Sequence, residues 1–151
     1  MKQYIGTKLI EAKEMNRGDY NVYRGWTTPE NENPTDEGYL VKYSDGYESW
    51  SPKKQFEEAY RESNNMTFGL ALEALKKGKK VARKGWNGKG MFLFLAKSTD
   101  IETDADLTVC EHMQGNLVLP SIVMKTADDK FCVGWLASQT DMLAEDWMII
   151  E

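Results

Sequence analysis

The residues whose types and spacing could best bind a ligand lie in one short turn, Arg83-Lys-Gly-Trp-Asn-Gly-Lys-Gly90, called the tryptophan turn below. It combines three glycines, cationic side chains and a tryptophan. Glycines let the backbone adopt positive φ, so several N–H groups can point inward and form a nest for an anion. Trp86 offers a ring on which a nucleobase can stack, and Trp135 offers a second one. These features would suit a nucleotide-like ligand. The residues of the turn by themselves favour the other interpretation, an ordinary tight hairpin turn at Asn87-Gly88 with both tryptophans in the core.

The turn is not one of the standard phosphate loops. The GxxxxGK[ST] spacing is absent, and the glycine order does not match GxGxxG in a βαβ unit. Catalytic arrangements are also missing, because His112 is the single histidine, Ser138 has no evident histidine partner, and neither HExxH nor GxSxG occurs. Cys110 and His112 form a close pair without further ligands, so we expect no metal site. The sequence favours binding over catalysis.

The charge distribution indicates a small anionic ligand. A net charge of -5 argues against a dedicated binder of duplex nucleic acid. Seven of the 19 basic residues nevertheless fall in one stretch without an acid: Lys76, Lys77, Lys79, Lys80, Arg83, Lys84 and Lys89. Such a concentrated positive charge suits a compact anion. The alternative, for Lys76 and Lys77 above all, is that lysines complement the C-terminal dipole of a helix.

The elements that must position this turn can be read from the flanking residues. Thr67 is an expected N-cap, apolar residues follow at helical spacing, and Gly78 stands where a left-handed C-cap is expected. A short strand at 80–83 then precedes the turn. The apolar run 91–96 follows it as a strand that does not alternate, so we expect this strand to be covered on both faces.

The remaining C-terminal residues predict a second hairpin and a capped helix. Residues 97–119 read as a long excursion, followed by strands at 122–126 and 130–135. Ser138 and Asp141 have the spacing of a capping box that opens a short helix. Residues 147–150 close the chain as a strand.

The N-terminal residues predict a separate hairpin and helix. Strands at 38–43 and 47–50 flank Ser44-Asp-Gly46, and Ser51 with Pro52 is expected to open a helix as N-cap and first helical residue. Residues 28–38 read as a surface loop, and Asn64-Asn65 as a joint. We therefore expect an α+β fold of small antiparallel sheets and short helices, with a hairpin-helix unit at 1–65 and a compact domain at 66–151.

The longest apolar run, Met91 to Ala96, is far shorter than the roughly 20 residues that span a membrane. The N-terminus also lacks the apolar region of a signal peptide. We expect a cytoplasmic protein without a membrane partner.

Two blocks of the sequence carry a family resemblance. They are MTFGLALEALKKGKKVARKGWNGKGMFLFL at 66–95, and IVMKT at 122–126 with WLASQTDMLAEDW at 135–147. Together they closely resemble the Thoeris anti-defense 2 family. The resemblance implies a non-catalytic phage protein, without a cofactor, that captures cyclic ADP-ribose-type immune signals. It further implies a homotetramer with ligand sites at subunit interfaces, and some relatives also hold cyclic oligonucleotide signals.

The resemblance maps nine candidate ligand-binding positions onto this chain: Arg83, Trp86, Asn87, Gly88, Lys89, Phe92, Trp135, Ser138 and Asp141. Trp86 and Trp135 are the expected stacking groups, and Asn87 with the neighbouring amides is expected at the polar edge of the ligand.

The other expected roles concern the ribose and the phosphates. Asp141 is expected to accept from ribose hydroxyls, and Arg83 or Lys89 to face the diphosphate. One departure is that Gly134 stands where the family pattern commonly has a proline. Two other functions stay open: an enzyme that degrades such signals, and a multimerising module whose acidic N-terminal unit binds a protein.

Overall fold

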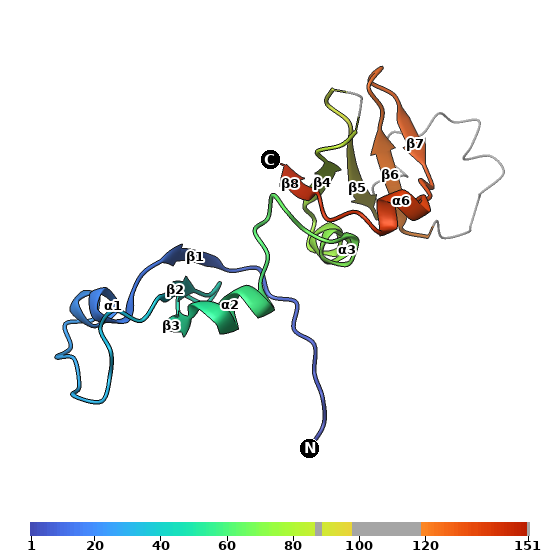
Figure 1. Ribbon diagram of the computed structural model, residues 1–151. Coiled ribbons are helices and arrows are strands. Elements are labelled where there is room, and N and C mark those ends of the chain that lie inside the picture. The colour runs from blue at the N-terminus through green and yellow to red at the C-terminus, as the bar shows by residue number, and fades with distance from the viewer. Residues whose placement is uncertain (87–88, 98–118, 151) are drawn as a thin grey trace. The chain divides into compact units, whose positions relative to one another are not determined.

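The computed structural model describes residues 1–86, 89–97 and 119–150. The chain forms two compact units, Met1–Arg61 and Glu62–Glu151. Each contains one small antiparallel sheet with short helices (Figure 1). The expected α+β class is confirmed. No described helix combines the length and the apolar character that crossing a membrane requires.

The first unit contains a three-stranded sheet and two helices, one before and one after the β-hairpin in the sequence. The strands run in the order β1-β2-β3, and the elements are β1 (Glu11–Glu14), α1 (Arg17–Tyr23), β2 (Gly38–Lys42), β3 (Glu48–Pro52) and α2 (Lys53–Ala59). The expected hairpin is β2-β3. Sequence reasoning missed β1 and α1, because β1 has four exposed residues and α1 is only seven residues long.

The start of α2 differs from the expectation by one residue. Ser51 pairs with Tyr39 in the β2-β3 ladder, so it belongs to the strand and is not the N-cap. Pro52 takes the N-cap position and makes no side-chain cap bond. The ladder hydrogen bonds thus extend two residues beyond the expected end of the strand at residue 50, and the helix begins at Lys53.

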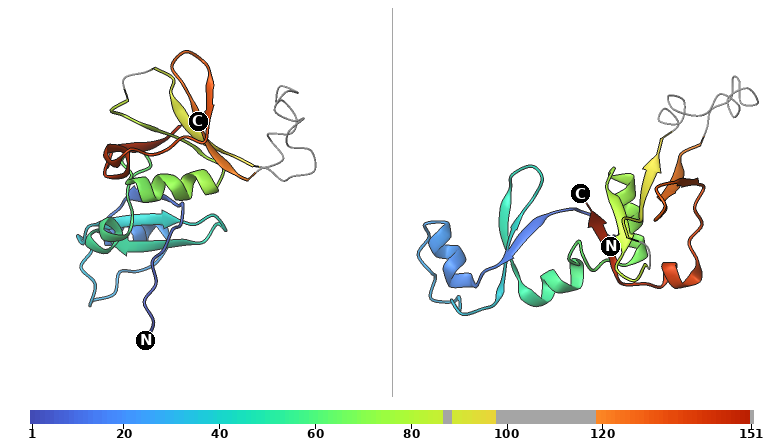
Figure 2. Two further views of the ribbon diagram at one scale, coloured as in Figure 1. Left: turned by 90° about the vertical axis from the view of Figure 1, so that its right-hand side faces the viewer. Right: turned by 90° about the horizontal axis from the view of Figure 1, so that it is seen from above.

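The second unit is a five-stranded antiparallel sheet in the order β7-β6-β5-β4-β8. Its elements are α3 (Phe68–Lys76), β4 (Lys80–Arg83), β5 (Phe92–Ala96), β6 (Ser121–Lys125), β7 (Phe131–Val133), α6 (Gln139–Met142) and β8 (Trp147–Ile150). The last strand returns antiparallel beside β4, so its first residue, Trp147, pairs with Arg83 at the start of the tryptophan turn. Figure 2 shows the second unit from two further sides. Helix α3 packs against one face of this sheet.

The core of the second unit lies between α3 and that face. Ala71 and Leu75 of α3 pack with Val81, Leu93 and Trp147, all fully or almost fully buried. The predicted caps of α3 are confirmed, because Thr67 accepts a hydrogen bond from the Leu70 N–H and Gly78 has a φ of 78°.

The opposite face of β5 is less completely covered by the described residues than expected. Phe92 and Phe94 alternate with the buried Leu93 and are only half-buried. Phe94 packs edge-on against Phe131 of β7, which is itself exposed. Strand β5 is thus apolar on both faces, but the helix covers one of them.

Candidate functional site

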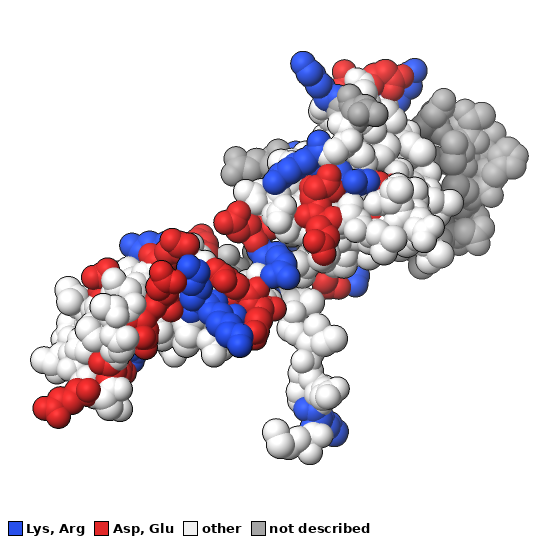
Figure 3. Space-filling view, viewed as in Figure 1, with Lys and Arg blue, Asp and Glu red and all other residues white. Residues whose placement is uncertain are grey.

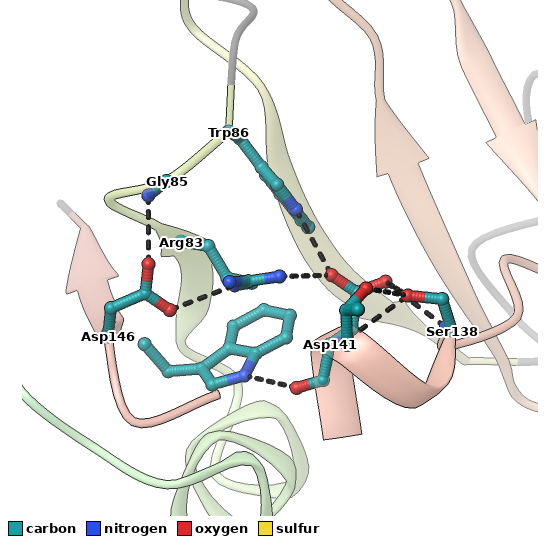
Figure 4. Close-up of polar contacts among 8 residues, drawn as sticks. Arg83, Gly85, Trp86, Ser138, Asp141 and Asp146 are labelled. Atoms are coloured by element: carbon teal, nitrogen blue, oxygen red, sulfur yellow. Dashed lines mark hydrogen bonds and ion pairs between the residues drawn. The ribbon is translucent and has the colours of Figure 1, made fainter. Parts of the chain in front are cut away.

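An arginine with two carboxylate partners lies beside the tryptophan turn, at a point where three segments meet (Figure 4). Arg83 ends β4, Asp141 lies in α6, and Asp146 precedes β8. The Arg83 Nε donates to Asp146 Oδ1 at 2.8 Å, and its Nη1 donates to Asp141 Oδ1 at 2.7 Å. The three side chains are 18%, 14% and 30% exposed. One guanidinium therefore ties together segments that lie about 60 residues apart in sequence.

The two carboxylates stay ionised in this environment. The hydrogen bond from Arg83 is the main reason that the pKa of Asp146 is lowered. For Asp141, burial opposes ionisation most strongly. Hydrogen bonds from Ser138 and Arg83 together outweigh it and lower the pKa of Asp141. Hydrogen bonds to Asp146 and Asp141 in turn raise the pKa of Arg83. The cluster therefore holds one positive and two negative charges.

The same carboxylates bind the first residues of the turn. The Gly85 N–H donates to Asp146 Oδ2 at 2.9 Å, and Trp86 Nε1 donates to Asp141 Oδ1 at 3.4 Å. A Cβ on Gly85 would lie 3.0 Å from Asp146 Oδ2. Glycine therefore allows the close approach of this carboxylate to the backbone.

Asp141 also closes the predicted capping box of α6, which is confirmed. Ser138 accepts a hydrogen bond from the Asp141 N–H at 3.2 Å, and Asp141 Oδ2 accepts from the Ser138 N–H at 3.1 Å. The Ser138 hydroxyl also donates to Asp141 Oδ2 at 2.6 Å. One carboxylate thus joins a helix N-terminus to the arginine and to the turn.

Three tryptophans form an aromatic cluster next to the ion pairs. The ring centroids of Trp86 and Trp135 are 6.2 Å apart, and each lies 5.5 to 6.3 Å from Trp147, with interplanar angles of 67° to 78°. Trp147 is fully buried and donates through Nε1 to the backbone oxygen of Asp141 at 3.0 Å. Trp86 and Trp135 are half-buried against this core. Their rings meet edge to face, so they do not lie parallel around a gap.

A backbone bulge places Trp135. The N–H groups of Gly134 and Trp135 both donate to the Ile122 oxygen, at 3.1 and 2.9 Å, and Gly134 has a φ of 79°. Gly134 and Trp135 thus both lie opposite Ile122 of β6, as in a β-bulge, and β7 ends at Val133 instead of the expected Trp135. A proline at position 134 cannot adopt this φ and has no N–H to donate. A proline at this position could therefore not form the bulge beside Trp135.

The structure thus brings together five of the nine candidate positions: Arg83, Trp86, Trp135, Ser138 and Asp141. Lys89 is exposed, and Asn87 and Gly88 lie outside the described residues. Phe92 lies apart from the tryptophan cluster, because the adjacent Leu93 faces the core that includes the tryptophans. The turn spans residues 84–91 between β4 and β5, which is longer than a two-residue hairpin turn.

The basic stretch is partly neutralised in the folded unit. Lys76 and Lys77 lie 2.7 and 4.0 Å from the carboxylate of Glu73, and Arg83 has its two aspartates. On the face seen in Figure 3, cationic and anionic side chains are interspersed. Lys84 and Lys89 are exposed and form no ion pair within the described ranges. These two lysines are the cations of the turn that remain available to an anion.

Sequence reasoning missed two members of this cluster, Asp146 and Trp147. Nothing in the local spacing of Glu145-Asp146 indicates a partner at Arg83. Cys110 and His112 lie outside the described residues. In the described part of the chain, no group of three or more His, Cys, Asp or Glu side chains is arranged to hold a metal ion.

Comparison with known proteins identifies the second unit. Residues 66–150 match the family described as the Thoeris anti-defense 2-like domain. The chain is also 48% identical over 85 residues to Thoeris anti-defense 2 of Bacillus phage SP01, which covers 56% of this chain and 94% of that protein. The matched region includes the turn, the aromatic cluster and all three ion-paired residues. The chain therefore belongs to the Thoeris anti-defense 2-like family.

Proposed function

We propose that this chain is a phage anti-defense protein that binds cyclic ADP-ribose-type signals and keeps them from the Thoeris effector without cleaving them. The observation that carries the proposal is the match of residues 66–150 to the Thoeris anti-defense 2-like domain, together with 48% identity to a protein of that name.

The turn supplies the chemistry that a cyclic nucleotide requires. The exposed part of Trp86 is the stacking surface for the base, and Trp135 supports its ring edge to face. We expect the exposed side chains of Lys84 and Lys89 to attract the diphosphate. Capture requires only tight, reversible binding, so the function needs no catalytic residue. Cyclic oligonucleotide signals are a second ligand class with the same chemistry.

We further propose that the protein acts in the host cytoplasm as a homotetramer. Besides the family resemblance, the half-buried Phe92 and Phe94 and the exposed Phe131 and Val133 support association, because they leave an apolar sheet face incompletely covered by the described residues. Light scattering after size exclusion should give about four times the 17.3 kDa chain mass. A monomer at micromolar concentration would overturn the tetramer alone.

Capture without cleavage is tested by recovery of the ligand. The full chain is incubated with each member of a panel of cyclic ADP-ribose isomers, free ligand is removed, and the protein is heat-denatured. We expect at least one isomer to be released intact and to be identified by mass spectrometry. Release of a hydrolysed product would instead favour an enzyme that degrades the signal. Absence of binding across the panel, with cyclic oligonucleotides included, would overturn the proposal.

A further inference from the structure

We infer that Arg83, Asp141 and Asp146 do not contact the ligand but position the tryptophan turn that does. This inference rests on the proposed function, since it concerns the same binding site. It differs from the sequence-based expectation that Asp141 meets the ribose and that Arg83 faces the diphosphate.

The hydrogen-bonding capacity of Asp141 is fully used inside the protein. An ionised carboxylate has about four acceptor sites. Asp141 Oδ1 accepts from Arg83 Nη1 and Trp86 Nε1, and Oδ2 accepts from the N–H and the hydroxyl of Ser138. A ribose hydroxyl would have to displace one of these donors, so Asp141 is better suited to hold Trp86 than to bind sugar.

Charge argues against a direct phosphate contact by Arg83. Two ionised aspartates surround the guanidinium at 2.7 and 2.8 Å, so the cluster carries one net negative charge. A diphosphate approaching this cluster meets no net attraction. Electrostatic attraction must then come from Lys84 and Lys89, which are exposed and lie in the turn itself.

The positioning role follows from the order of contacts. Arg83 orients Asp146, which accepts the Gly85 N–H, and Arg83 also orients Asp141, which accepts from Trp86. The two aspartates thus hold consecutive residues, Gly85 and Trp86, at the start of the glycine-rich turn. A turn without these hydrogen bonds would lose conformational entropy when it binds a ligand. Because the hydrogen bonds order the start of the turn beforehand, the entropy lost on binding is smaller.

The decisive variant is Asp146→Ala, because a positioning role and a purely electrostatic role predict opposite changes in ligand affinity. The substitution removes a negative charge beside the site, so a purely electrostatic role predicts equal or tighter binding of an anion. Positioning predicts weaker binding, because the Gly85 N–H loses its acceptor. We expect the Kd for the tightest-binding cyclic ADP-ribose isomer, measured by titration calorimetry, to rise about tenfold, the scale of one charge-assisted hydrogen bond.

Glu145→Ala is the matched control, since it removes the same charge from the exposed neighbouring position. Its Kd should change by less than about twofold, in the direction of tighter binding. The salt dependence of binding gives an independent readout. Asp146→Ala should keep the parent slope of log Kd against log salt, whereas Lys89→Gln should reduce that slope because it removes a phosphate contact.

The outcomes separate this inference from the proposed function. If the parent chain binds no member of the panel, the proposed function fails. If the parent binds and Asp146→Ala binds as tightly as Glu145→Ala, the positioning role is overturned. Should Asp146→Ala not fold, Asp146→Asn serves instead, because its amide has a single oxygen and can accept from only one of Gly85 and Arg83. The positioning role then predicts weaker binding than for Glu145→Gln, and equal or tighter binding would overturn the inference.

Discussion

The backbone N–H of Gly85 donates to Oδ2 of Asp146 at 2.9 Å, although 61 positions separate the two residues in sequence. This bond joins the turn after β4 to the residue that precedes β8, and the other oxygen of the same carboxylate accepts from Arg83. The start of the turn is thus fixed by the C-terminal part of the unit, which the adjacent β4 and β8 strands hold in register.

Gly85→Ala should destabilise the second unit by about 1 kcal/mol, because the added Cβ displaces the Asp146 carboxylate and weakens one hydrogen bond. Gly69→Ala is the matched control. Gly69 lies in α3 with no atom closer than 3.9 Å to an added Cβ, so alanine should stabilise the unit by about 0.5 to 1 kcal/mol. Urea unfolding, resolved by hydrogen exchange of residues in this unit, measures both. Equal effects of the same sign would contradict the close contact at Gly85.

Ser138→Ala should cost the second unit about 1 kcal/mol, since it removes the N-cap acceptor of α6. The hydroxyl also donates to Asp141, so its loss should loosen the carboxylate that holds Trp86 and reduce ligand affinity. Gln139→Ala, at an exposed position of the same helix, should leave both quantities nearly unchanged. Thermal unfolding and calorimetric titration measure them. An intact melting temperature for Ser138→Ala would argue against the capping box.

Trp147→Ala should destabilise the second unit by roughly 3 to 5 kcal/mol, because the fully buried ring supports Trp86, Trp135 and α3. Trp147→Phe keeps an aromatic ring but loses the hydrogen bond to the Asp141 oxygen, so a smaller cost is expected. Trp26→Ala, in the first unit where the ring is 51% exposed, serves as the control. Chemical denaturation provides the free energies. If Trp26→Ala lowered the free energy of unfolding of the second unit as much as Trp147→Ala does, the role of Trp147 in the core of that unit would be contradicted.

The first unit should lose stability on acidification through Glu32. Hydrogen bonds from Arg17 and Asn21 lower the pKa of Glu32 to about 2 from an ordinary value of 4.5. The unfolded chain therefore binds this proton first, so the contribution of Glu32 is complete above about pH 4.5 and disappears as the pH falls toward 2.

Glu32→Gln removes that titration, so its melting temperature should fall less than that of the parent between pH 5 and pH 2.5. Scanning calorimetry measures the difference, with Glu30→Gln as the control. Glu30 lies in the same loop and forms no ion pair among the described contacts. Parallel pH profiles for parent and Glu32→Gln would show that the Arg17 pair does not contribute in this range.

Local sequence signals identified most of the elements of the second unit. The N-cap at Thr67, the C-cap glycine at 78 and the Ser138 capping box depend on residues only three or four positions apart, so spacing alone indicates them. The end of β7 was placed wrongly, because the bulge at Gly134 depends on a partner carbonyl at Ile122. The short β1 and α1 carry too few periodic residues to be recognised.

For the candidate site, the sequence by itself determined the tryptophan turn, its glycines and its cations, because these residues are contiguous and their chemistry is a property of their types. It also determined the family, through blocks of matching residues. Only the tertiary structure decided that Arg83 is paired with Asp141 and Asp146, that Trp86 packs edge-on against Trp135 and Trp147, and that Phe92 faces away. These contacts depend on the β4-β8 pairing, which brings together residues about 60 positions apart and leaves no local periodicity to read.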